Sequence, residues 1–142
     1  MTSSFACATP IRGARGWTDT QFLALLRAYR AYGGLWRFRD ALRMSRASGR
    51  DRSSTLDGLF AFEWGEQRWL PAFQFQPLRL APCERAMMVV AELRPVFDDM
   101  DVAHWCIQSS IWLDGAAPVK LMPMRCSDVI QAARIDRFVA AG

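Results

Sequence analysis

The sequence has little of what metal sites and most catalytic sites are built from. It holds one histidine, His104, and four cysteines far apart with no Cys-x-x-Cys pair: Cys7, Cys83, Cys106 and Cys126. Zinc sites use four ligands in paired spacings, so we predict no metal and reduced, mostly buried thiols. No glycine-rich phosphate loop follows a predicted strand. His104 and Cys106 share one predicted helix, where near neighbours point apart. We therefore predict no catalytic residues, no cofactor and no enzyme, with an unrecognised enzyme kept as the third hypothesis.

Long apolar runs are also missing. No stretch approaches the roughly 20 apolar residues that a membrane-spanning helix needs. Residues 1–16 lack the apolar stretch of about 7–15 residues that a signal peptide contains. We therefore predict a cytoplasmic protein without a membrane partner. What the sequence does contain is 51% hydrophobic and 12% aromatic residues, enough to bury a core.

Lysine is scarce, and the arginines are unevenly placed. Seventeen Arg stand against Lys120 alone. Residues 1–60 hold ten Arg and four acids, a net charge of +6, whereas residues 61–142 hold seven Arg, one Lys and ten acids, a net charge of −2. This split predicts a basic first half that can meet a polyanion and a mildly acidic second half that can meet a basic partner. A GC-rich genome would explain the choice of Arg over Lys, but not its placement.

The sequence of the first half predicts two helices, a third short helix and a hairpin. After a loose arm over residues 1–16, Thr18 and Gln21 form a capping box for a helix that Gly33 and Gly34 stop. A second helix is expected over residues 35–47, then a polar loop and a short helix capped by Ser53 or Ser54. Aromatic runs around a glycine-containing turn predict a β-hairpin over residues 60–70. Pro71 predicts that the second hairpin strand lies at a sheet edge.

This order of elements is that of a small winged helix-turn-helix module, which reads duplex DNA with a helix in the major groove. Arginines on an exposed stripe and in the following loop, with hydroxyls at a helix N-terminus, suit phosphate contacts. The predicted DNA-binding residues are Arg43, Arg46, Arg50, Arg52, Ser53 and Ser54. An arginine stripe is also common on ordinary solvated helices, and both interpretations stay open.

The second half predicts a small helical bundle. Pro82 and Pro95 bracket one helix, and Asp98 or Asp99 caps the next. Asp114-Gly115 predicts a tight turn with a left-handed residue, and Pro118 opens a brief helical turn. Ser127 is expected to cap a last helix over residues 128–140. The fold class predicted for the whole chain is mainly α with one short β-hairpin: a winged helix-turn-helix-like half followed by a small helical bundle.

Several motifs in this half occur in a recognisable order. Residues 69–75 read Trp-Leu-Pro-Ala-Phe-Gln-Phe, residues 101–105 read Asp-Val-Ala-His-Trp, and residues 112–119 read Trp-Leu-Asp-Gly-Ala-Ala-Pro-Val. A terminal helix with Val129 follows. Over about residues 69–142 this order resembles the toxin-binding domain of Xre/MbcA/ParS-type antitoxins and the junction ahead of it. Residues 122–124, Met-Pro-Met, depart from that family's small polar loop, and the first half is not visibly a standard Xre domain.

The resemblance implies that the C-terminal end reaches into the active cleft of a toxin, of the NAD-consuming RES type in the pairs it resembles. The predicted partner-binding residues are Trp112, Arg134, Arg137 and Phe138. Arg and Phe are enriched at interface centres, although the same residues also suit an ordinary helix surface capped by one Phe. Most of residues 105–142, both tryptophans included, is explained by packing of a three- or four-helix core, so the partner-binding hypothesis narrows to the last helix.

The sequence thus predicts three regions: a flexible arm (1–16), a helical, winged-helix-like DNA-binding or dimerisation region (17–75) and a helical toxin-binding-like domain (76–142). The preferred hypothesis is an antitoxin-like protein that neutralises a cognate toxin and autoregulates by binding duplex DNA. The alternative is a DNA-binding transcriptional regulator or adaptor without a toxin partner. A homodimer is a further predicted assembly.

Overall fold

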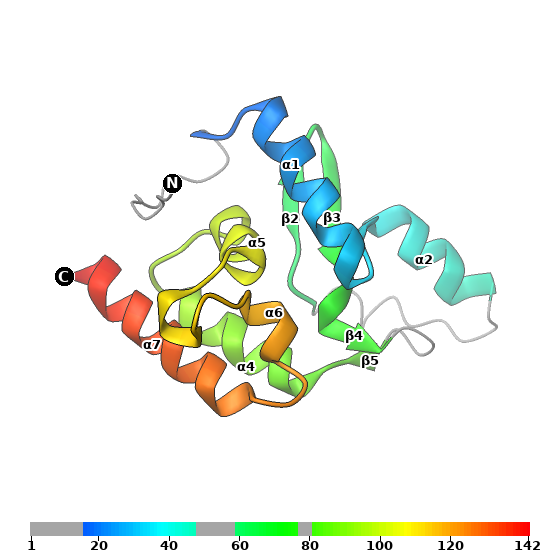
Figure 1. Ribbon diagram of the computed structural model, residues 1–142. Helices are drawn as coiled ribbons and strands as arrows, with labels where there is room; N and C mark the ends of the chain where they lie inside the picture. Colours follow the sequence, from blue (N-terminus) through cyan, green and yellow to red (C-terminus); the bar gives the residue numbers. More distant parts are fainter. Residues whose placement is uncertain (1–15, 48–58, 77–80) are drawn as a thin grey trace.

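The computed structural model describes residues 16–47, 59–76 and 81–142, and within them the chain is mainly helical with a small antiparallel sheet (Figure 1). The predicted arm over residues 1–16, apart from its last residue, and the short helix after Ser53 or Ser54 lie outside the described residues. The predicted mainly-α class is confirmed. None of the described helices is long and apolar enough to cross a membrane.

Helix α1 (Asp19–Tyr29) begins as its sequence predicts. Thr18 caps it, and Thr18 and Gln21 exchange both bonds of the capping box, at 3.2 and 2.8 Å. A short 3-10 turn, η3 (Arg30–Tyr32), follows and ends at Gly33, whose φ is 92°. A Cβ on Gly33 would lie 2.9 Å from the Cβ of Ala72, so both the left-handed backbone and the close approach require glycine here.

The sequence predicts that residues 35–37 form the start of the second helix, and this prediction is wrong. These residues form β1 (Leu35–Arg37), and α2 (Phe38–Ala47) begins only after it. β1 pairs with β3 (Gln67–Pro71), the second strand of the predicted hairpin, whose first strand is β2 (Phe62–Trp64). The predicted hairpin is therefore confirmed, but it is part of a three-stranded sheet of order β1-β3-β2.

The prediction of an edge position for the second hairpin strand is wrong, because β3 is the central strand. Pro71 is tolerated because it is the last residue of β3, opposite Leu35 at the end of the ladder, where a missing N–H donor costs little. A second ladder of two residues joins β4 (Phe75–Gln76) to β5 (Ala81–Pro82). Pro82 thus lies in a strand, and α4 (Glu84–Leu93) begins two residues later than expected.

The sheet has α1 on one face and α2 on the other. On the α1 side, the ring of Phe22 lies 5.2 Å from that of Trp69 and 5.6 Å from that of Trp64. On the α2 side, Leu70 and Ala41 belong to a separate small apolar cluster. Because β1 separates α1 from α2, the two helices are not joined by the direct turn that the sequence predicted. The segment expected to supply the third helix lies outside the described residues.

The C-terminal half contains α4, α5 (Asp99–Ile107), a 3-10 turn η5 (Ile111–Leu113), α6 (Pro118–Leu121) and α7 (Cys126–Ala141). Asp98 caps α5 through the N–H of Asp101, as predicted. Asp114 takes the predicted left-handed conformation, with φ 57°. Ser127 does not cap the last helix, which begins at Cys126 with Arg125 in the cap position.

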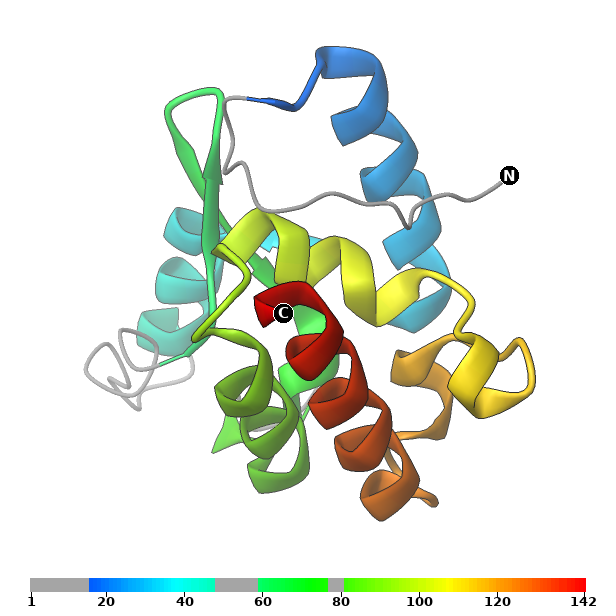
Figure 2. The same ribbon diagram turned by 90° about the vertical axis from the view of Figure 1, so that its left-hand side faces the viewer.

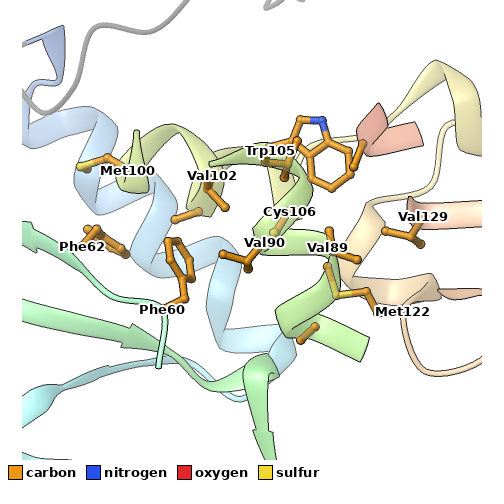
Figure 3. Close-up of a cluster of buried hydrophobic side chains, with 14 of the residues drawn as sticks. Phe60, Phe62, Val89, Val90, Met100, Val102, Trp105, Cys106, Met122 and Val129 are labelled. Atoms are coloured by element: carbon orange, nitrogen blue, oxygen red, sulfur yellow. The ribbon is translucent and has the colours of Figure 1, made fainter. Parts of the chain in front are cut away.

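One main core joins the two halves of the chain (Figure 3). Phe60 and Phe62 from the hairpin side pack in the same cluster as Val90 of α4, Trp105 of α5 and Val129 of α7. The Tyr29 hydroxyl of α1 donates to the Ala103 carbonyl of α5 at 2.6 Å. The regions predicted on either side of residue 76 therefore share a core. α7, one of the helices of that core, carries most of the predicted partner-binding residues.

Candidate partner-binding surface

Helix α7 presents three different sides. Its inward stripe, Val129, Ala132 and Ala133, is buried and lies against the main core. Figure 2 shows α7 with α4 on one side and α6 and residues 111–113 on the other. Helical spacing places Arg134 and Arg137 on the α4 flank and residues 135, 138 and 139 on the opposite, outer side.

Arg134 and Arg137 bind within the molecule. The Nε of Arg134 lies 3.2 Å from Glu92 of α4, and Nη1 of Arg137 lies 3.3 Å from the same carboxylate and donates to the Glu92 carbonyl at 3.4 Å. The Glu92 side chain is 20% exposed, whereas those of Arg134 and Arg137 are 56% and 41% exposed, so water screens these bonds in part. Both arginines therefore hold α7 against α4. Their predicted role as partner anchors stays a prediction.

Phe138, by contrast, points outward. It is 80% exposed, and Val139 and Ile135 beside it are 66% and 37% exposed. Residues at i, i+3 and i+4 share one helix face. We call Ile135, Phe138 and Val139 the outer face of α7. Single exposed apolar residues are ordinary, but three on one face form a contiguous apolar surface of the kind that marks interaction sites.

Trp112 lies at the border between this surface and the core. It is 45% exposed, and its indole N–H donates to Oδ1 of Asp136 at 2.8 Å. The neighbouring Ile111 is 80% exposed. Trp105, in contrast, is 6% exposed and donates its own N–H to Oδ2 of Asp136 at 2.7 Å. Trp105 therefore lies in the core, as the sequence predicted. The side chain of Trp112 is about half packed against the protein and half exposed to solvent.

Ile111 and Asp136 were not among the predicted site residues. Asp136 follows Val129 by seven positions and Ala133 by three, so it continues the inward stripe of α7 with a carboxylate. A carboxylate at the end of an apolar stripe needs buried hydrogen-bond donors, and two tryptophans in the preceding segment offer N–H groups. This signal was present in the sequence. Which indoles would reach Asp136 depends on long-range packing.

The predicted DNA-binding residues fall into two groups. Arg43 and Arg46 of α2 are both exposed and lie on one side of the helix with Arg39. Arg43 forms an ion pair with Asp40 at 3.6 Å, and its side chain remains 75% exposed. The other four, Arg50, Arg52, Ser53 and Ser54, lie outside the described residues. Among the described residues, the structure therefore places Arg43 and Arg46 of the predicted phosphate-binding residues on one side of α2.

Of the residues with redox or acid–base chemistry, Cys106 is buried and His104 is half-buried. Burial raises the pKa of the Cys106 thiol and lowers the pKa of His104, whose ring lies edge-on to Trp17 at 5.2 Å. Both groups are therefore held in their neutral forms. Cys83, Cys106 and Cys126 are free thiols. Within residues 16–47, 59–76 and 81–142, no three His, Cys, Asp or Glu residues lie close enough to hold a metal ion.

A half-open hollow of about 500 Å³ lies where the first half meets the second. Its lining includes Tyr32, Trp36 and Phe73 from the first half of the chain and Arg85, Val119 and Met122 from the second. The Arg85 guanidinium donates to the Pro123 carbonyl at 2.6 Å, so it is fixed at the rim. The lining is mostly apolar and does not contain the converging polar groups expected of a site for chemistry.

No protein-family model, no curated protein and no solved structure matched the chain.

Proposed function

We propose that the chain is an antitoxin-like binding protein that neutralises a cognate toxin protein through its C-terminal helical region. The proposal combines the ordered motifs of residues 69–129, which resemble a toxin-binding domain, with the exposure of apolar side chains at the end of α7. Neutralisation occurs by covering the partner's cleft, as in the resembled pairs with RES-type toxins. No residue of this chain takes part in the toxin's chemistry.

The outer face of α7 is the observation on which the proposal rests. Phe138 is 80% exposed near the C-terminal end of α7, and Ile135 and Val139 on the same helix face are also exposed. A protruding Phe with aliphatic neighbours has the form of an anchor that fills a pocket on a partner. Arg134 and Arg137 support it indirectly, because their bonds to Glu92 keep the end of α7 helical and in place.

Co-expression tests the proposal. The product of the gene immediately beside this one is expected to arrest growth when produced alone, and to be harmless and to co-purify when produced with this chain. Phe138→Ser should abolish rescue while leaving the chain folded. Met124→Ser is the matched control, because Met124 is 88% exposed but precedes α7 and lies apart from its outer face. If no neighbouring product is toxic or co-purifies, the proposal fails.

We propose as a second activity that the chain binds duplex DNA through α2, as an autoregulator or as a regulator without a toxin. The exposed arginines of α2 support it, because guanidinium groups on one helix side suit phosphate contacts. In a titration with the duplex upstream of the gene, binding should weaken steeply with salt. The double variant Arg43→Gln/Arg46→Gln should lower the salt slope by about two. The charge-matched control is Lys120→Gln/Arg125→Gln. Absence of binding at low salt would remove this activity.

A further inference from the structure

The hollow between the two halves of the chain has three half-buried aromatic side chains in its lining. Tyr32 ends η3, Trp36 is the middle residue of β1, and Phe73 lies two residues after β3. Val119 and Met122, each 5% exposed, line the hollow from the second half. Because the protein covers the three rings only in part, they retain apolar surface that an aromatic ligand would remove from water.

Two of these rings are held in place by the protein itself. The indole N–H of Trp36 donates to the Gly33 carbonyl at 3.0 Å. The ring of Phe73 stacks on the buried ring of Tyr29, with the centroids 6.2 Å apart and the planes 13° from parallel. Since neither ring has to be ordered when a ligand enters, the aromatic part of the hollow is preformed, which lowers the entropic cost of binding.

Small residues keep the hollow open. Ala31, Gly33, Ala72 and Ala86 also belong to its lining, and none of them has a side chain long enough to fill it. The volume of about 500 Å³ lies within the range of about 300–1,000 Å³ that is usual for sites of small organic molecules. The hollow therefore has room for one such molecule between the two halves of the chain.

A single arginine, Arg85, supplies the charge of the lining. Its Nη1 donates to the Pro123 carbonyl at 2.6 Å, which fixes the guanidinium and leaves further N–H donors for another acceptor. In the part of the chain that the structure describes, no carboxylate forms an ion pair with Arg85, whereas Arg134 and Arg137 both pair with Glu92. A guanidinium without a counter-charge beside an apolar hollow is complementary to a ligand with an apolar body and one carboxylate.

From these observations we infer that the hollow is a binding site for a small aromatic monocarboxylate, whose ring lies among Tyr32, Trp36 and Phe73 and whose carboxylate binds Arg85. The ligand is held and not converted, because the hollow has no converging polar groups for chemistry. The inference is independent of the proposed function, since Ile135, Phe138 and Val139 of the outer face of α7 do not line the hollow.

Isothermal titration calorimetry of the full chain tests the charge of the ligand, with cinnamate as the probe and cinnamamide as its neutral isostere. The wild type should bind cinnamate with a Kd below about 1 mM and cinnamamide about five- to tenfold more weakly, because only the carboxylate pairs with the partly solvated Arg85. Arg85→Gln should bind both ligands with the same affinity. No binding of cinnamate at about 1 mM, or an unchanged preference in Arg85→Gln, would overturn the inference.

Lys120→Gln is the matched control for charge. Lys120 is exposed and next to Val119 in sequence, but it does not line the hollow. The variant should keep the preference for cinnamate over cinnamamide. Loss of that preference in Lys120→Gln, to the same extent as in Arg85→Gln, would mean that the net charge of the chain and not Arg85 selects the carboxylate, and would contradict the proposed site.

A substitution that fills the hollow tests where the ligand lies. Ala31 is exposed and lines the hollow, so Ala31→Phe should fold normally and weaken cinnamate binding at least about tenfold, because its ring occupies the space of the ligand. Ala24→Phe, at an exposed position of α1 away from the hollow, should bind within about twofold of the wild type. Wild-type affinity in Ala31→Phe would place the ligand elsewhere and overturn the inference.

The thiol of Cys83 gives a second measure of position without filling the hollow. Cys83 is a free, half-buried thiol in the lining, so a bound ligand should shield it from alkylation by iodoacetamide. With cinnamate at about ten times its Kd, the rate of Cys83 alkylation, followed by peptide mass spectrometry, should fall about tenfold. A rate that cinnamate leaves unchanged would show that the bound ligand does not occupy the hollow.

Discussion

Helices α2 and α7 differ in what they leave facing solvent. α2 buries Ala41 and Ser45, and it exposes arginines together with one apolar side chain, Met44. α7 buries Val129, Ala132 and Ala133 against the core and exposes Ile135, Phe138 and Val139. Exposed arginines cost nothing in water, so their presence on α2 says little about function. A contiguous apolar face is unfavourable in water and is therefore the more informative of the two surfaces.

The comparison also separates residues that look alike in sequence. Arg134 and Arg137 are the same residue type as the α2 arginines. Both nevertheless pair with Glu92 and so help to hold α7 against α4. Arg43 has one ion pair, to its own-helix neighbour Asp40. The predictions that follow test this division between structural and exposed residues, beginning with the largest expected effect.

The inward side of α7 should tolerate charge least. Ala133 is 0% exposed, so Ala133→Asp would bury a carboxylate without a partner and should cost about 3–5 kcal/mol of unfolding free energy. Gln131→Asp, two residues earlier on the exposed side, should cost less than about 1 kcal/mol. Urea denaturation followed by circular dichroism measures both. Equal losses would show that α7 is not packed as described.

Removing the shared acceptor of the α7 arginines should have a moderate effect. Glu92→Gln weakens the bonds to both Arg134 and Arg137, and we expect a loss of about 1 kcal/mol in the same urea experiment. Growth rescue by the variant should persist, because Phe138 remains in place. Loss of rescue without loss of stability would mean that the arginines contact the partner directly.

His104 should make stability depend on pH. Burial lowers its pKa in the folded chain below the unfolded value of about 6.5. Between the two values only the unfolded chain binds the proton, so stability falls as pH drops below about 6.5 and levels off beneath the folded pKa. His104→Gln should flatten the part of the urea-midpoint profile that lies below about pH 6.5. An identical slope in the variant would contradict the burial of His104.

The arginines of α2 should matter least for folding. Arg43→Gln/Arg46→Gln should change the unfolding free energy by less than about 0.5 kcal/mol, because both side chains are exposed and an i, i+3 surface pair contributes little. The urea midpoint measures this. A larger loss would show that these residues are structural, as Arg134 and Arg137 are, and would remove the contrast between α2 and α7.

Local signals in the sequence predicted local structure well. The capping box at Thr18, the cap at Asp98, the left-handed turn at Asp114 and the helix start at Pro118 are all confirmed. Each depends on atoms within a few residues of one another, so the sequence contains the whole cause.

What the sequence did not predict depends on distant partners. β1 exists because Leu35–Arg37 pairs with residues 69–71, more than thirty positions later, and nothing in three residues announces that pairing. β3 is central for the same reason. Asp136 is a site residue only because Trp105 and Trp112 reach it from two other elements. The exposure of Phe138 and the engagement of Arg134 likewise follow from how α7 packs on α4.

Equilibrium binding of the neighbouring gene product to Phe138→Ser tests the central claim most directly. An anchor residue at an interface centre is worth about 2 kcal/mol or more, so the variant should bind at least about thirtyfold more weakly than the wild type. Met124→Ser, altering a side chain exposed to a similar degree, should bind within about twofold of the wild type. Wild-type affinity in Phe138→Ser would contradict the assignment of the outer face of α7 as the partner-binding surface.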